Sequence, residues 1–77
     1  MLVTLLGVRV LDFPASDGSQ IKGTQLFYCH DDPDVQGKAT DKVFVKSEIP
    51  MPKLELNKPL QIYFNKKGKV DSIAKAD

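Results

Sequence analysis

The apolar residues of this chain recur with a period of two, in short runs separated by polar segments that carry glycine or proline. Alternation of this kind is typical of β-strands, whose successive side chains point to opposite faces of a sheet. The runs predict five strands, at 2–13, 23–30, 42–49, 60–65 and 69–74. Since 77 residues leave no room for a second core, we expect a single domain over 1–77. The predicted fold is all-β, a small five-stranded antiparallel barrel that is OB-like, with an SH3-like barrel as the alternative.

Glycine and proline give the strands their local features. Gly7 lies inside the first run, where it predicts a bulge or a sharp bend. Pro50 and Pro52 follow the third run and end it, because proline cannot donate to a ladder. The segment 65–68, Asn-Lys-Lys-Gly, predicts a short hairpin turn with Gly68 in the left-handed conformation.

Cysteine and histidine each occur once, as Cys29 and His30. One cysteine excludes an intramolecular disulfide and indicates a reducing, cytoplasmic setting. So short a chain often needs an additional source of stability, and we expect a homodimer to supply it. The apolar start of the chain lacks the features of a signal peptide, and no apolar run approaches the roughly 20 residues that cross a bilayer, so no membrane association is expected.

Catalysis has little support in the sequence. Cys29 and His30 are neighbours in a predicted strand, so their side chains diverge to opposite faces and cannot form a dyad. The acidic stretch 31–34 lacks the spacing of an EF-hand loop, and no phosphate-binding glycine motif occurs. We therefore expect a protein that is not an enzyme and that holds neither a cofactor nor a metal.

The third run carries the clearest functional signal. Val43 and Val45 share one face, which their β-branched side chains mark as the core face, and Lys42, Phe44 and Lys46 share the other. An exposed ring between two lysines is suited to single-stranded nucleic acid, because a base stacks on the ring while ammonium groups meet the phosphates. In the alternative interpretation Phe44 packs under the acidic loop at 31–41 or into a dimer interface.

Two further aromatic residues extend this pattern. Phe27 and Tyr28 must face opposite sides of the second strand, and Tyr28 is the predicted surface residue because its hydroxyl tolerates water; a half-buried tyrosine is the alternative. Tyr63 precedes the basic turn at 66–69, which could also be a solubilising hairpin tip. The net charge is only +1, so a positive face requires the acidic residues to lie elsewhere.

The layout of these segments resembles that of the gene-V-type single-stranded DNA-binding proteins of filamentous phages. The resemblance runs from Ser16-Asp17-Gly18-Ser19 and Lys22-Gly23 through Gln25-Leu26-Phe27-Tyr28 to Val43-Phe44-Val45-Lys46, and then loosely through the late hairpin. It implies an OB-fold homodimer that coats single strands without sequence preference. The chain departs from the pattern in its long acidic loop and in having one arginine, Arg9.

The sequence therefore predicts a non-catalytic, sequence-tolerant single-stranded DNA-binding protein that acts in phage or mobile-element DNA replication. A small β-barrel interaction module or accessory subunit, in which the same aromatic residues line a protein groove, is the alternative. The predicted nucleic-acid-binding residues are Lys22, Tyr28, Lys42, Phe44, Lys46, Tyr63, Lys66, Lys67 and Lys69.

Overall fold

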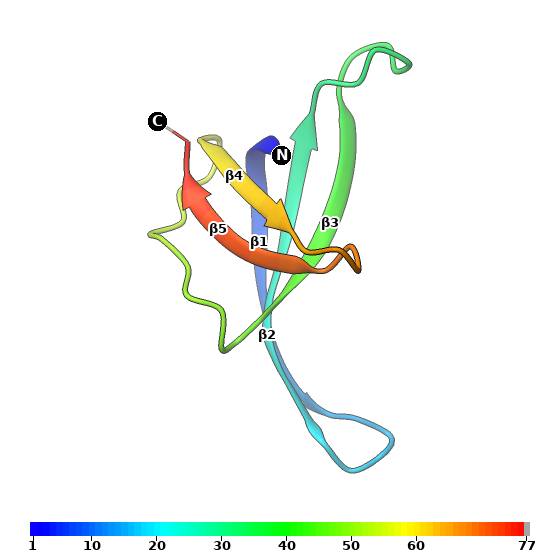
Figure 1. The fold of residues 1–77 in the computed structure, drawn as a ribbon, viewed down its shortest axis with the longest axis vertical. Coiled ribbons are helices and arrows are strands. Elements are labelled where there is room, and N and C mark those ends of the chain that lie inside the picture. Colours follow the sequence, from blue (N-terminus) through cyan, green and yellow to red (C-terminus); the bar gives the residue numbers. More distant parts are fainter. Residues whose placement is uncertain (77) are drawn as a thin grey trace.

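The computed structural model describes residues 1–76, and its secondary structure consists of five β-strands (Figure 1). The strands are β1 (Leu2–Pro14), β2 (Gln20–His30), β3 (Ala39–Lys46), β4 (Pro59–Phe64) and β5 (Val70–Lys75). They form one sheet in the order β3-β2-β1-β4-β5, and every neighbouring pair is antiparallel. The predicted all-β, antiparallel, five-stranded class is confirmed. No helix among the described residues is long and apolar enough to cross a membrane.

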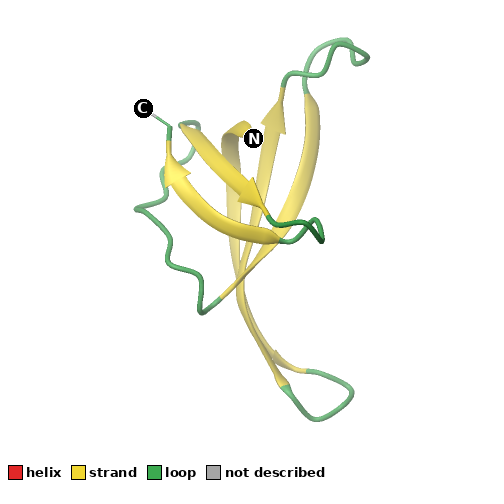
Figure 2. Ribbon diagram, viewed as in Figure 1, coloured by secondary structure: helices red, strands yellow, loops and turns green. Residues whose placement is uncertain are grey.

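Three predicted strand boundaries were displaced by three residues, and one of them is the start of β3, at Ala39 rather than at Lys42. β2 begins at Gln20 rather than at Gly23, because the β1–β2 ladder continues as far as the pair Pro14 and Gln20. β3 ends at Lys46 rather than at Ile49, because a turn closes there, in which the Ile49 amide donates to the Lys46 carbonyl at 3.0 Å. Figure 2 shows the long loop that follows this turn and leads into β4.

The sheet is not closed into a barrel, so this part of the prediction was wrong. β3 and β5 are its two edges, and the ladders of residues 1–76 do not join them. The β1–β4 ladder is short and involves Leu2, Val3 and Thr4 of β1. Beyond it the β4–β5 hairpin lies across the β1–β2–β3 layer (Figure 1), instead of running alongside it.

The core lies between the β4–β5 hairpin and the inner face of the β1–β2–β3 layer. Its fully buried side chains are Leu5, Leu26, Val45 and Ile62, which come from four different strands. Val3, Tyr28, Leu60, Val70 and Ile73 complete the cluster. Part of the 47–58 loop packs against it, through Ile49, Met51 and Leu54. The inner face of the layer is thereby covered, and the outer face is left to solvent.

The bulge predicted at Gly7 is present, and it changes which residues of β1 face outward. The ladder between β1 and β2 shifts register between Leu5 and Gly7. Leu5 pairs with the buried Tyr28, and after the shift Val8 pairs with the buried Leu26. Because directly paired residues point to the same face, inward positions change from odd to even numbers at the bulge. Arg9 is consequently placed on the outer face.

The far half of the β1–β2 hairpin extends beyond the core as a two-stranded arm (Figure 1). Val10 continues the inward-facing series, yet its side chain is 76% exposed, because β4 and β5 do not reach this part of the arm. The arm ends in a tight turn, with the Gly18 amide donating to the Ala15 carbonyl at 3.1 Å and Gly18 at φ +89°.

Candidate nucleic-acid interface

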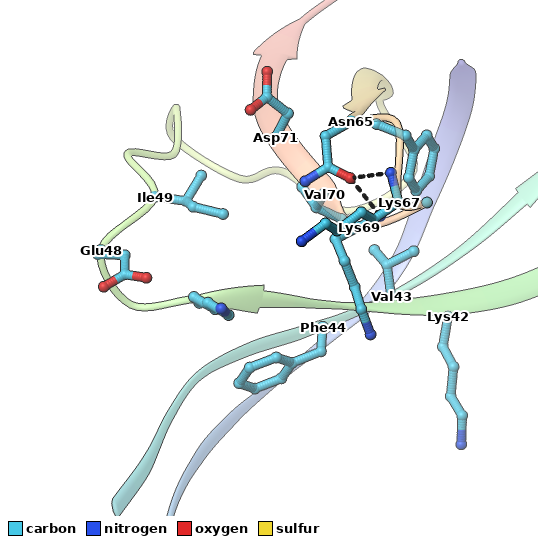
Figure 3. A pocket seen from close by; sticks show the side chains of 13 residues that line it. Lys42, Val43, Phe44, Glu48, Ile49, Asn65, Lys67, Lys69, Val70 and Asp71 are labelled. Carbon is cyan, nitrogen blue, oxygen red and sulfur yellow. Dashed lines mark hydrogen bonds between the residues drawn. The ribbon is translucent and has the colours of Figure 1, made fainter.

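A groove of about 780 Å³ occupies the seam between the two sheet edges, where a closed barrel would have its last ladder. β3 forms one wall, and the β4–β5 turn with the start of β5 forms the other (Figure 3). The lysines that line it are Lys42, Lys46, Lys67 and Lys69, and the acidic residues are Glu48 and Asp71. Cations therefore outnumber carboxylates along the groove, and the lysines come from segments about 20 residues apart in the chain.

Phe44 lies on the outer face of β3 and is 36% exposed. Figure 3 shows its ring and the side chain of Val43 on opposite sides of the strand. Lys42 and Lys46 are exposed and occupy the adjacent positions on the same face, so a lysine flanks Phe44 on either side along the strand. One part of the ring covers the backbone of Gly23 on β2, and the exposed remainder is available to a planar ligand.

The β4–β5 turn has the geometry that the sequence predicts. The Asn65 amide donates to the Lys69 carbonyl at 2.8 Å, and Gly68 adopts φ +77°. The Asn65 side chain adds a brace, because its Oδ1 accepts from the backbone amides of Lys67 at 2.9 Å and Lys69 at 3.1 Å (Figure 3). An asparagine side chain that bonds its own turn in this way fixes the backbone from which the two groove lysines project.

The remaining predicted lysines fall into two groups. Lys22 lines a smaller groove of about 350 Å³ together with Phe44 and Lys46, so it extends the same surface toward the arm. Lys66 is exposed but does not line either groove. Tyr63 is 49% exposed, as predicted, yet it also lies outside these grooves. The structure therefore brings Lys22, Lys42, Phe44, Lys46, Lys67 and Lys69 together, and it leaves Tyr63 and Lys66 apart.

The prediction that Tyr28 is a surface residue was wrong. Its side chain is 3% exposed and belongs to the core cluster, so its ring cannot stack on a base. Tyr28 has the same alternation as Leu26, which is fully buried. Burial raises the pKa of the Tyr28 hydroxyl, and the carboxylate of Asp41, its partner across the ladder, raises it further.

Phe27, the neighbour of Tyr28, takes the surface position that was assigned to the tyrosine. It is half-buried on the outer face, paired with Gly7 on one side and with Lys42 on the other. The guanidinium carbon of Arg9 lies 5.8 Å from the centre of its ring. Gln25 shares the alternation of Phe27, and this polar neighbour is the signal in the sequence that marks its face as outward.

The acidic loop is separate from this surface. It connects β2 to the start of β3, whereas Lys46 lies at the end of β3. Asp31 is paired with Lys38 within the loop, and this contact holds the pKa of the Asp31 carboxyl below its usual value. None of the aspartates at 31–34 lines the seam groove or the smaller groove beside it, so this acidic cluster is separate from the lysines, and the carboxylates of the grooves are Glu48 and Asp71.

Cys29 and His30 occupy successive positions of β2, which directs their side chains to opposite faces of the strand. Among residues 1–76, histidine, cysteine and acidic side chains do not gather in groups of three that could hold a metal ion. The candidate site thus consists of lysines and phenylalanine rings, with Arg9 beside Phe27 and with Glu48 and Asp71 as the carboxylates of the seam groove. Comparison of the chain with known protein families, with curated proteins and with solved structures finds no match.

Proposed function

We propose that this protein binds single-stranded DNA, without catalysis and without sequence preference. The observation that carries the proposal is the exposed ring of Phe44 between Lys42 and Lys46, beside a groove whose other wall supplies Lys67 and Lys69. Stacking of a base on an aromatic ring is tolerant of sequence, because every base has a π-face. The lysines act as flexible point charges for the phosphates, and they fix no particular base edge.

The shape of the surface favours a single strand over a duplex. In a duplex the faces of the bases are stacked on one another, so a ring on a protein surface cannot reach them without unstacking the helix. An unpaired strand presents both its bases and its phosphates to one surface. We further propose, on the resemblance to gene-V-type proteins, that the protein acts as a homodimer in the cytoplasm and serves phage or mobile-element DNA replication.

The proposal is tested by titrating a fluorescently labelled oligothymidine with the protein and following anisotropy at several salt concentrations. Each phosphate neutralised on a single strand contributes about −0.7 to the slope of log K against log salt. Engagement of the four groove lysines would therefore give a slope of about −2.8. A duplex of the same length is the control and should bind more weakly. Absence of binding at low salt, or affinity that is independent of salt, would refute the proposal.

A protein-interaction module is the second candidate, and a different surface favours it. Val8 and Val10 are 41% and 76% exposed on the arm, where an apolar surface is open to a partner. Under this alternative, Val10→Ser would change the sedimentation coefficient or the capture of a partner, while Phe44→Ala would leave nucleic-acid affinity unchanged. Loss of oligothymidine binding in Phe44→Ala with unaltered sedimentation favours the first function.

A further inference from the structure

The outer face of the β1–β2–β3 layer carries a second aromatic ring beside Phe44. The ladders place Phe44, Gln25 and Arg9 in one row across the three strands. They place Lys42, Phe27 and Gly7 in the row two residues further along. Each row therefore holds one phenylalanine and one cation, in opposite order. Phe27 has Lys42 beside it on β3 and Arg9 diagonally on β1, and Phe44 has Lys42 two residues away on its own strand.

Arg9 is held in place on this face. Its guanidinium donates to Gln25 Oε1 at 2.5 Å and its Cζ lies 5.8 Å from the centre of the Phe27 ring. A guanidinium has five N–H donors and stays charged at all accessible pH values. Arg9 is exposed and its one hydrogen bond in the described residues is to Gln25, so its remaining N–H groups are available to a phosphate in a forked geometry.

Gly7 keeps one side of Phe27 uncovered. A Cβ at this position would lie 3.7 Å from Phe27 Cδ2, in van der Waals contact with the ring, so any larger side chain would extend along it. On the β3 side, a shallow groove of about 310 Å³ is lined in part by Leu6, Phe27 and Lys42. Lys42 also lines the seam groove. The surface around Phe27 is thus continuous with the surface around Phe44.

We propose that Phe27 is a second base-stacking platform and that Arg9 binds the phosphate between the two stacked nucleotides. The bound strand then leaves the seam groove and crosses the outer face of β3, β2 and β1. This inference rests on the proposed function and adds to it a path for the strand. Phe44 and Phe27 are diagonal neighbours on adjacent strands, a relationship that separates residues by about 7–8 Å. This is roughly twice the 3.4 Å rise per nucleotide of a duplex strand. A strand with one base on each ring is therefore extended, which B-form DNA does not permit.

The experiment compares the affinities of three leucine variants for a labelled oligothymidine of about eight nucleotides. Phe27→Leu and Phe44→Leu keep an apolar side chain but lose the π-face, and each should weaken binding by about 5- to 100-fold. Phe13→Leu is the control, because Phe13 is an exposed ring, 44% accessible against 36% for Phe44, on the outer face of the arm outside the two rows. It should bind as the wild type does. Thermal unfolding of each variant establishes that the fold is retained.

Arg9 is tested separately through salt dependence. Arg9→Gln should lower the slope of log K against log salt by about 0.7, and Arg9→Lys should restore the slope without restoring the full affinity. A Phe27→Leu variant that binds like Phe13→Leu, while Phe44→Leu is weakened, overturns this inference and leaves the proposed function in place. A wild-type protein that does not bind oligothymidine refutes the proposed function, and this inference with it.

Discussion

The ring of Phe44 packs on the backbone of Gly23 on the neighbouring strand and leaves no room for a side chain at position 23. A Cβ built at Gly23 would lie 2.5 Å from Phe44 Cζ and 2.8 Å from its Cε1, and it would also collide with the Val45 carbonyl oxygen. Real Cβ atoms essentially never approach other heavy atoms within 3.0 Å. The glycine is therefore what allows the ring to lie flat along the sheet.

Gly23→Ala is expected to destabilise the fold, because the ring and the β3 backbone must both move to admit the methyl group. Overpacking of this kind costs about 1–3 kcal/mol, and urea unfolding monitored by circular dichroism measures it. We also expect weaker oligothymidine binding, since the displaced ring no longer lies between Lys42 and Lys46. Unchanged stability in Gly23→Ala would show that the ring does not occupy this position in solution.

The lysines of the β4–β5 turn allow a prediction with an internal control. Lys67 and Lys69 line the seam groove, whereas Lys66 in the same turn does not. The double variant Lys67→Ala/Lys69→Ala should reduce the salt slope of oligothymidine binding by about 1.4, with the loss of two phosphate contacts. Lys66→Ala removes a lysine from the same turn and should leave the slope nearly unchanged. If Lys66→Ala reduces the slope by as much as each lysine of the double variant does, the attraction is diffuse and no defined groove binds the strand.

Two of the three glycines with positive φ, Gly68 and Gly18, separate stability from binding. Gly68 at φ +77° lies in the turn that forms part of the groove, and Gly18 at φ +89° lies at the tip of the arm. Neither has an atom within 4 Å of a built Cβ, so alanine at each site introduces backbone strain without a collision. Each alanine should cost about 1–2 kcal/mol in thermal or urea unfolding. Only Gly68→Ala is expected to weaken oligothymidine binding as well, because it displaces Lys67 and Lys69.

Tyr28 predicts how stability depends on alkaline pH. Burial and the carboxylate of Asp41 raise the pKa of its hydroxyl in the folded state above the value near 10 of an exposed tyrosine. The hydroxyl is neutral in both states below pH 10, and above it the unfolded state ionises first. The stability due to neutral Tyr28 is thus complete below pH 10 and is lost as the pH rises, by up to about 1.4 kcal/mol per pH unit.

Tyr28→Phe keeps the buried ring and removes the titrating group. Compared with the wild type, it should lose less stability between neutral pH and pH 11 in urea unfolding, and it should bind oligothymidine with unchanged affinity at pH 7. Tyr28→Ala should cost about 3–5 kcal/mol at all pH values, as expected for a ring removed from a core. A Tyr28→Phe variant with impaired DNA binding and normal stability would contradict the core position of this residue.

The sequence predicts strands and turns well because these depend on local pattern. The five strands, the bulge at Gly7, the turn at Gly68 and the outward ring of Phe44 all follow from alternation and from the conformational freedom of glycine. Tyr28 was misassigned because Phe27 and Tyr28 are both large and aromatic. The alternation with Gln25 and Leu26 marks Phe27 as outward and Tyr28 as inward, whereas the tolerance of a tyrosine hydroxyl for water favours the opposite assignment.

The open seam and the outer face depend on register, which the local pattern does not contain. The sequence offers no measure of how many residues of β1 pair with β4, or of whether a ladder joins β3 to β5. Arg9 joins the row of Phe44 and Gln25 only because the bulge shifts the β1–β2 register. Arg9 and Gln25 are 16 positions apart in the chain, and they face each other only in the register that the bulge produces.

The unpaired edges of β3 and β5 have a mechanical consequence. Had a ladder joined these strands, any change in their separation would have broken backbone hydrogen bonds. In the ladders of residues 1–76 the two edges are connected only through the rest of the sheet, so a small increase in its twist can widen the gap while every ladder stays intact. Under the proposed function, an edge of this kind lets the groove accept purines and pyrimidines alike without the loss of a ladder hydrogen bond.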